Sequence, residues 1–118
     1  MQVEDHAILG GFTGVHQFCR IGAYSFAAIS SVIVKDIPPY VLVSGNTARP
    51  NGLNREGLRR HDFPADEVEA LRRAYRILYR EGLLLQEAVQ RLRELAGQSE
   101  HVARMVKFIS SSERGIAR

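Results

Sequence analysis

The sequence contains very little of several residue types. Its 118 residues include one cysteine, four prolines and no tryptophan. A single thiol excludes an internal disulfide and a metal site built from several thiolates, and it favours a reducing, cytoplasmic location. We expect no transmembrane segment, because no apolar run approaches the roughly 20 residues that a membrane-spanning helix needs. The acidic opening MQVEDH also lacks the apolar stretch of a signal peptide.

Basic charge is concentrated in the second part of the chain. Residues 1–45 carry two basic and three acidic side chains, whereas residues 46–118 carry 14 basic and ten acidic ones. This excess could attract a phosphate-bearing small molecule or an acidic protein. We expect no nucleic-acid partner, since neither an aromatic-basic signature nor a helix-turn-helix pattern accompanies the charge.

Apolar residues recur every six positions through the first third of the chain. The register runs without a miss through Val3, Leu9, Val15, Ile21, Ala27 and Ile33. Four positions after each of these come Ala7, Thr13, Cys19, Ser25, Ser31 and Ile37, of which all but the last are small. Such hexapeptide repeats predict a parallel β-helix, in which the apolar side chain points into a narrow interior and the small one fits where the walls converge.

In the left-handed form of this fold three hexads make one triangular coil, so residues 3–38 amount to two coils. A Gly-rich β-meander is the alternative, but it should show hairpin dipeptides such as Asn-Gly, and none occurs before Pro38. Cys19 is interpreted as a small residue in a tight interior rather than as a nucleophile. At least three repeats are normally needed and Met1 starts within a repeat, so we expect further coils upstream.

The remaining residues predict a helical region. The run Asp36-Ile37-Pro38-Pro39-Tyr40 should end the hexads, because proline cannot donate to a strand ladder. A loop over Gly45–Gly52 and a short helical turn over Leu53–Arg60 follow. The fold class is therefore β + α: the last two coils of a left-handed parallel β-helix (1–42), a connecting loop and short helix (43–63), and a small three-helix C-terminal domain (64–118).

Three amphipathic helices are expected in that last region. The first begins at Asp62-Phe63-Pro64 and ends at Gly82, and the others cover about 85–96 and 100–111. Residues expected to face inward are Val68, Leu71, Tyr75 and Leu78, then Ala88, Val89, Leu92 and Leu95, then Val102, Met105, Val106 and Ile109.

Arg72, Arg76 and Arg80 form a stripe on the outer face of the first of these helices. Two interpretations stay open for this stripe. It is either a solvated face paired with Glu69 and Glu81 or a docking surface for an acidic partner.

Several segments together resemble a known family. They are GGFTGVHQFCRIGA (10–23), DIPPYV (36–41), GN (45–46), NREGLRR (54–60), AYRILYR (74–80) and the SERG tail (112–115). In this order they closely resemble the bacterial acyl-[acyl-carrier-protein]:UDP-N-acetylglucosamine O-acyltransferases of lipid A biosynthesis. Hexads alone would be weak evidence, since many transferases and γ-type carbonic anhydrases share them. A carbonic anhydrase is disfavoured because the histidines lack a clustered ligand spacing.

The resemblance implies a homotrimer that transfers an R-3-hydroxyacyl group from acyl carrier protein to the 3-hydroxyl of UDP-N-acetylglucosamine. It implies no cofactor beyond the carrier-protein thioester, no metal, and an active site between subunits. By match to the family, the substrate-binding positions are His16, Gln17, Asn54, Glu56 and Arg60. Ile29 matches the acyl-chain ruler, where a larger side chain shortens the groove, and a plain core role for Ile29 is the alternative.

The chain also departs from the family. The family's general base is a histidine in a coil upstream of Met1, so no catalytic residue is expected here, and this chain alone should be inactive. His61 stands where a second arginine is usual, and His6 and His101 are interpreted as surface residues. A non-catalytic, trimerising module that binds a UDP-sugar or carrier protein is the alternative function.

Overall fold

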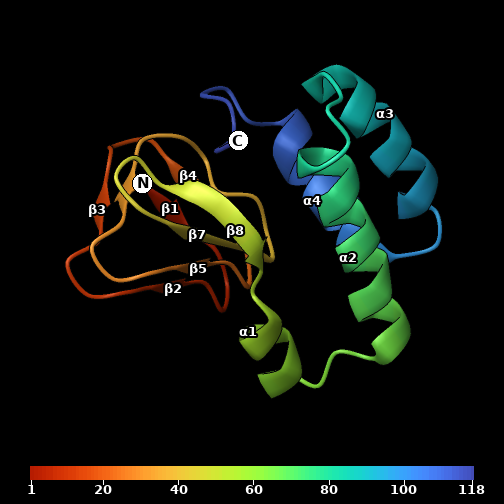
Figure 1. The fold of residues 1–118 in the computed structure, drawn as a ribbon, viewed down its shortest axis with the longest axis horizontal. Coiled ribbons are helices and arrows are strands. Elements are labelled where there is room, and N and C mark those ends of the chain that lie inside the picture. Colours follow the sequence, from red (N-terminus) through yellow and green to blue (C-terminus); the bar gives the residue numbers. More distant parts are fainter.

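The computed structural model describes residues 1–118. Six two-residue strands lie along the hexads: β1 (Gln2–Val3), β2 (Ile8–Leu9), β3 (Gly14–Val15), β4 (Arg20–Ile21), β5 (Phe26–Ala27) and β6 (Val32–Ile33). They pair in parallel as β1 with β4, β2 with β5 and β3 with β6, and each partner lies 18 residues further along the chain. Three walls with an 18-residue repeat make the predicted β-helix, seen beside the helices in Figure 1.

Burial of the inward residues increases from one coil to the next. Val3 is 46% exposed at the open end, whereas Ile21 and Ile33 are at most 1% exposed. Cys19 is completely buried, as its place in the repeat predicts. Each coil is therefore covered by the coil that follows it.

A third, shortened coil follows the two that the sequence predicts. Ile37 bridges to Ile21, strand β7 (Val41–Ser44) pairs in parallel with β5, and Asn46 bridges to Val32. The offsets are 16, 16 and 14 residues instead of 18. The shift arises before the prolines, because Ile33 and Ile37 are four residues apart whereas their partners Val15 and Ile21 are six apart. The prolines do not end the stacking, and the boundary predicted after residue 42 falls inside β7.

The sequence predicts a loop over Gly45–Gly52, and the structure contradicts this prediction from Arg49 onward. Residues Arg49–Leu53 form strand β8, which pairs antiparallel with β7. The Gly, Asn and Pro content that suggested a loop occurs on the last strand of the sheet, where only one edge is paired.

One residue in each turn of the prism adopts a left-handed backbone. His6, Phe12, Phe18, Tyr24 and Ser30 have φ angles between 59° and 71°, and they stand six residues apart. Tyr40, at 70°, repeats the position of Tyr24 in the third coil. None is the glycine or asparagine that usually marks this conformation, so sequence analysis does not find these positions.

Four helices complete the fold: α1 (Arg55–Arg60), α2 (Ala65–Tyr79), α3 (Leu85–Ala96) and α4 (Glu100–Ser110). The three long ones confirm the predicted amphipathic helices. Most of the residues expected to face inward are buried, while Val68, Val89 and Leu95 are half-buried. No helix combines the length and the apolar character that crossing a membrane requires.

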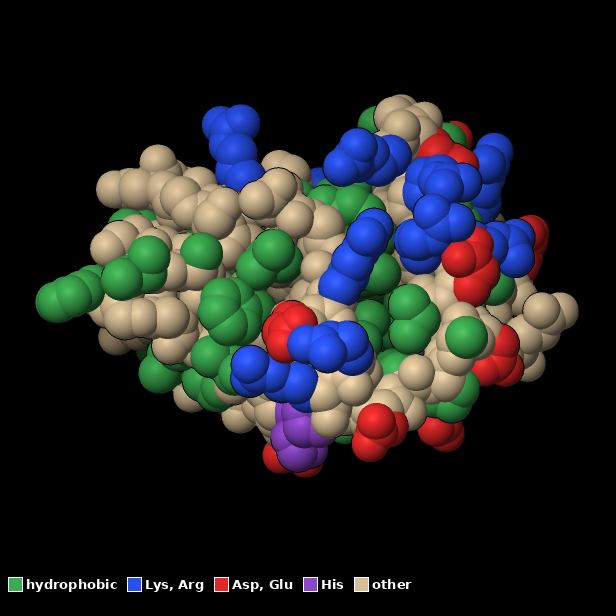
Figure 2. Space-filling model, turned by 60° about the horizontal axis from the view of Figure 1, so that its bottom comes forward, with side chains coloured by type: hydrophobic (Ala, Val, Ile, Leu, Met, Phe, Trp, Pro, Cys, Tyr) green, Lys and Arg blue, Asp and Glu red, His purple; other side chains and the backbone are tan.

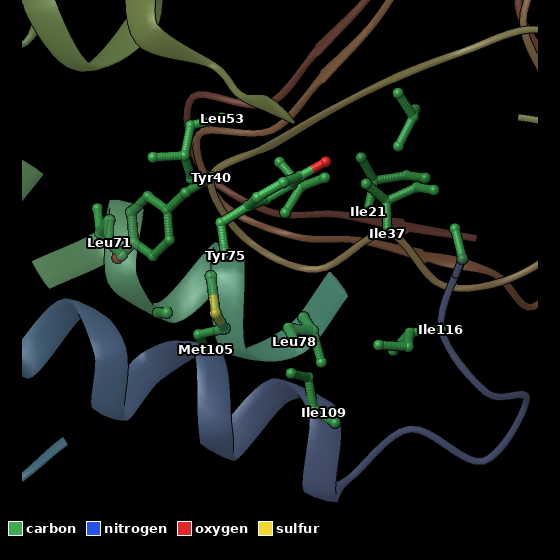
Figure 3. Packing of buried hydrophobic residues seen from close by; sticks show 14 of the residues in the cluster. Ile21, Ile37, Tyr40, Leu53, Leu71, Tyr75, Leu78, Met105, Ile109 and Ile116 are labelled. Carbon is green, nitrogen blue, oxygen red and sulfur yellow. The ribbon is translucent and has the colours of Figure 1, made fainter. Parts of the chain in front are cut away.

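The prism and the helices share one hydrophobic core. Ile21, Ile37 and Tyr40 from the prism lie in the same cluster as Leu78 and Met105 from the helices (Figure 3). The end of the chain then returns to the prism, where Ile116 bridges to Asp36. The predicted substrate-binding residues therefore lie on a single packed body.

Candidate functional site

His16 and Gln17 occupy the turn between β3 and β4. The His16 backbone N–H donates to the carbonyl of Ile33 at 2.8 Å, which fixes the turn against the second coil. Both side chains are exposed. The Nδ1 atom of His16 lies 2.8 Å from Nη2 of Arg114 and 3.1 Å from the carbonyl oxygen of Gln17. The imidazole is thus held by the C-terminal segment rather than free to rotate.

Asn54 caps helix α1 and joins it to the prism. Its side-chain oxygen accepts from the Gly57 backbone N–H at 3.1 Å, and its amide nitrogen donates to the carbonyl of Tyr24 at 2.9 Å. Only 6% of Asn54 is exposed. This geometry gives Asn54 a clear structural role, and its contact with a ligand stays a prediction.

Gly57 is a residue of the same motif to which the sequence analysis assigned no role. A Cβ atom built there would lie 2.4 Å from the amide nitrogen of Asn54, which is closer than real contacts allow. Any side chain at Gly57 would displace the cap. The spacing of Asn54 and Gly57 in this motif is therefore explained by the helix cap, independently of any role in ligand binding.

Glu56 and Arg60 form an exposed ion-pair cluster on α1. The Glu56 carboxylate lies 2.6 Å from the guanidinium of Arg59 and 3.1 Å from that of Arg60. Its hydrogen bond to Arg59, with a smaller contribution from Arg60, holds the pKa of Glu56 below its usual value. A carboxylate that stays ionised can accept hydrogen bonds from hydroxyl groups, and Arg60 can donate to a diphosphate.

The predicted substrate-binding residues form two separate groups in one chain. His16 and Gln17 lie in the β3–β4 turn beside Arg114, whereas Asn54 is bonded to Tyr24 in the β4–β5 turn. These turns stand at opposite ends of β4, on two different edges of the prism.

Ile29 lies exposed beside an apolar wall of the prism. It is 68% exposed, and a Cβ atom at Gly11 would lie 3.9 Å from its side chain. On the same wall the outward positions of β2, β5 and β7 are Ile8, Phe26 and Leu42, in register across the sheet. The other two walls carry Gln2 with Arg20 and Gly14 with Val32 at these positions. Only this wall offers a continuous surface of large apolar side chains to a hydrocarbon chain, which argues against a plain core role for Ile29.

Six aromatic rings pack together where one edge of the prism, formed by the turns before β2, β5 and β7, meets the helical region. His6, Tyr24 and Tyr40 follow one another along one edge of the prism, with ring centroids 4.8 and 5.7 Å apart. His61, Phe63 and His101 pack against them from the helical region. Burial raises the pKa of Tyr40 to about 12.

His101 is not the surface residue that the sequence suggested. Its Nδ1 atom lies 2.8 Å from the Tyr40 hydroxyl, and its ring centroid lies 4.5 Å from that of Phe63. His6 is exposed as expected, although its ring lies 4.4 Å from that of His61. His61 therefore contributes a ring to this group.

Basic side chains gather on one part of the surface, with a few acidic ones among them (Figure 2). Arg72 pairs with Glu69 at 3.0 Å as expected, but Glu81 pairs with Arg91 of α3 rather than with Arg80. A cavity of about 380 Å³ opens among the basic residues Arg55, Arg72, Arg76 and Arg80 beside Tyr75. All three arginines of the stripe line this cavity, and of the three only Arg72 forms an ion pair. This geometry is compatible with both interpretations of the stripe.

Curated relatives match the whole chain. The acyl-[acyl-carrier-protein]–UDP-N-acetylglucosamine O-acyltransferase of Thiobacillus denitrificans is 54% identical over 117 residues, which are 99% of this chain and 45% of the relative. The protein of the same name from Burkholderia orbicola is 52% identical over 122 residues, covering 100% of this chain and 47% of the relative. The chain thus spans a little under half the length of the curated relatives it matches.

Solved structures agree with the sequence comparison. The UDP-N-acetylglucosamine acyltransferase of Francisella novicida superposes with a TM-score of 0.95 at 39% identity, over 98% of this chain and 43% of that one. The Moraxella catarrhalis UDP-N-acetylglucosamine O-acyltransferase gives 0.92 at 45% identity, over 96% and 44%. These matches confirm the left-handed form of the β-helix.

A family model, described as the second domain of UDP N-acetylglucosamine O-acyltransferase, matches residues 36–117. This segment contains the third coil and all four helices, including the NREGLRR motif (54–60) at α1. The chain therefore belongs to the UDP-N-acetylglucosamine O-acyltransferase family.

Proposed function

We propose that this chain is the C-terminal part of an enzyme that transfers an R-3-hydroxyacyl group from acyl carrier protein to the 3-hydroxyl of UDP-N-acetylglucosamine, the first step of lipid A biosynthesis. The observation that carries the proposal is the match to acyltransferases of this specificity over 99% of the chain. The single buried thiol suits the reducing cytoplasm in which we place the activity.

The proposal gives each predicted residue a role that its chemistry supports. His16 and Gln17 are exposed donors and acceptors for sugar or phosphate oxygens. Glu56 accepts from hydroxyl groups, and Arg60 binds the diphosphate once it exchanges its contact with Glu56 for the ligand. The chain supplies no general base, which we assign to a histidine of the upstream coils. No cofactor enters the reaction, because the thioester of the carrier protein already activates the acyl group.

The proposal also requires a homotrimer. Two features support it: the two groups of binding residues lie on different edges of one prism, and the wall around Ile29 exposes apolar side chains. Neighbouring copies would bring the groups together and cover the wall. Acyl carrier protein, as an acidic partner, would dock on the basic surface around Arg72, Arg76 and Arg80.

A chimera tests the proposal directly. The N-terminal coils of the Thiobacillus denitrificans relative are joined to this chain at the aligned position, and acyl transfer is measured by mass spectrometry of the acylated nucleotide sugar. We expect a trimer with activity near that of the intact relative, and no transfer by the 118-residue chain alone. A folded, trimeric chimera without activity would refute the proposal. UDP-sugar binding without transfer in that chimera would instead favour the binding-module alternative.

Two neighbouring arginines provide matched variants for the nucleotide site. Both Arg59 and Arg60 contact Glu56, but only Arg60 belongs to the predicted set. In the chimera we expect Arg60→Met to raise KM for UDP-N-acetylglucosamine about tenfold or more, the cost of losing a charged hydrogen bond, and Arg59→Met to change it little. Equal effects of the two variants would contradict the assignment of Arg60.

A further inference from the structure

The last residues of the chain lie along the prism edge that carries His16. The Asp36 N–H donates to the Gly115 carbonyl at 3.0 Å, and the Ala117 N–H donates to the Asp36 carbonyl at 2.8 Å. The Ser112 hydroxyl donates to the buried Asp36 carboxylate at 2.6 Å. These bonds fix the backbone on both sides of Arg114. The side chain of Arg114 is thereby held next to a turn that lies 98 residues earlier in the sequence.

The contact between Arg114 and His16 determines which ring nitrogen carries the proton. Nη2 of Arg114 lies 2.8 Å from Nδ1 of His16. A guanidinium only donates hydrogen bonds, so Nδ1 must be the acceptor and the neutral imidazole must carry its hydrogen on Nε2. The Nε atom of Arg114 is buried without a hydrogen-bond partner, so the protein encloses this end of the guanidinium while Nη2 reaches His16.

The Gln17 carbonyl favours the opposite arrangement. It lies 3.1 Å from the same Nδ1 atom, and a carbonyl oxygen can only accept. With Arg114 removed, Nδ1 would carry the hydrogen and donate to Gln17, and Nε2 would become an acceptor. The side chain of Arg114 therefore decides between two states of an exposed ring whose Nε2 atom makes no hydrogen bond within the chain.

We propose that Arg114 is a positioning residue for His16, which it keeps as an Nε2–H donor for an oxygen atom of the nucleotide sugar. The proposal rests on the proposed function for the identity of the ligand. It adds that His16 binds as a donor only, and that the C-terminal segment controls this property. Arg114 itself need not touch the substrate.

Nitrogen-15 shifts of the imidazole measure the tautomer without any need for activity. In the chimera, with the His16 signals assigned by a His16→Gln variant, we expect neutral His16 to be in the Nε2–H form. Arg114→Met should move the population about five- to tenfold toward the Nδ1–H form, as the exchange of one hydrogen bond permits. Arg91→Met, which removes an exposed arginine paired with Glu81, should leave the His16 shifts unchanged.

The kinetic measurement separates this inference from the proposed function. We expect Arg114→Met to raise KM for UDP-N-acetylglucosamine severalfold, and Arg114→Lys, which keeps a donor, to restore part of the loss. A wild-type His16 in the Nδ1–H form, or a tautomer that Arg114→Met does not change, would overturn the inference. A changed tautomer with an unchanged KM would support the control by Arg114 and contradict the assignment of His16 to the nucleotide sugar.

Discussion

At the scale of single residues, the closest packing in the prism occurs at glycines. A Cβ atom at Gly22 would lie 2.3 Å from the backbone nitrogen of Pro39 in the next coil. Because backbone atoms cannot rotate away, we expect Gly22→Ala to lower the free energy of unfolding by about 2–3 kcal/mol. Gly14→Ala is the control, since a Cβ atom there meets nothing within 4 Å. Urea denaturation checks both variants, and equal stability of the two would show that the coils are not stacked this closely.

Two buried tyrosines predict a loss of stability at high pH. Burial raises the pKa of Tyr40 to about 12, and it also raises the pKa of Tyr79. A phenol whose pKa is higher in the folded state stabilises the fold fully below its unfolded value near 10, and this contribution is lost as the pH rises toward 12. We expect the denaturation midpoint to fall between pH 10 and 12.

The double variant Tyr40→Phe, Tyr79→Phe should weaken this fall, because neither ring can then ionise. Tyr75→Phe is the control for the loss of a tyrosine hydroxyl, which in the wild type accepts from the Gly52 N–H at 2.7 Å. If the double variant lost stability between pH 10 and 12 as steeply as the wild type, other groups would be responsible for the fall.

At the scale of elements, the sequence predicts the strands and helices that follow a regular apolar spacing, and it misses those that depart from this spacing. The six hexads and three long helices follow from apolar spacing alone, since each has one buried face. The third coil is missed because its repeat is two residues shorter between Ile33 and Ile37, and because Pro38 and Pro39 are expected to end the ladder. Strand β8 is missed because turn-type residues such as Pro50 and Gly52 lie on its unpaired side. The left-handed turn residues are missed because backbone hydrogen bonds between coils, such as those from Tyr24 to Asp5 and from Ser30 to Gly11, stabilise the turns independently of residue preference.

Arg118 binds the backbone at the C-terminal end of α2. Arg118 donates to the carbonyls of Leu78 at 3.1 Å and Leu83 at 2.6 Å, which lie where α2 ends. Charged donors at a helix C-terminus bind free carbonyls and oppose the dipole. We expect Arg118→Met to destabilise the fold by about 1–2 kcal/mol, and Arg91→Met, which removes a surface ion pair, by less than about 0.5 kcal/mol. Thermal melts compare the variants, and an equal loss would mean that the tail does not secure α2.

At the scale of the whole molecule, the candidate site is only partly predictable. The family motifs identify Asn54, Glu56 and Arg60, and the spacing within α1 is that of an ion pair between Glu56 and the arginines that follow it. Only coordinates show that Asn54 is buried against the Tyr24 carbonyl. The contact between His16 and Arg114 spans 98 residues, and no local pattern marks it. Sequence spacing places side chains within an element, whereas the contacts of Asn54 with Tyr24 and of His16 with Arg114 depend on how separate segments pack together.

The exposed apolar wall leads to a prediction about acyl-chain length. Ile29 is 68% exposed in one copy, and the neighbouring copy needed to close a groove over it would leave its side chain within that groove. A branched side chain there should block the far end of an extended hydrocarbon. In the chimera we therefore expect Ile29→Gly to shift donor preference toward longer hydroxyacyl chains, with kcat/KM for a donor two methylenes longer rising tenfold or more, since each buried CH₂ contributes about 0.8 kcal/mol.

Phe12→Ala is the matched control, because Phe12 is 92% exposed at a turn and its loss removes apolar surface without opening space beside Gly11. Competition between carrier-protein donors of different length in one reaction measures the ratio of kcat/KM values directly. An Ile29→Gly enzyme that keeps the wild-type preference would show that Ile29 does not limit the groove. A similar shift in Phe12→Ala would show that the length of the chain is sensed by the whole wall rather than at one position.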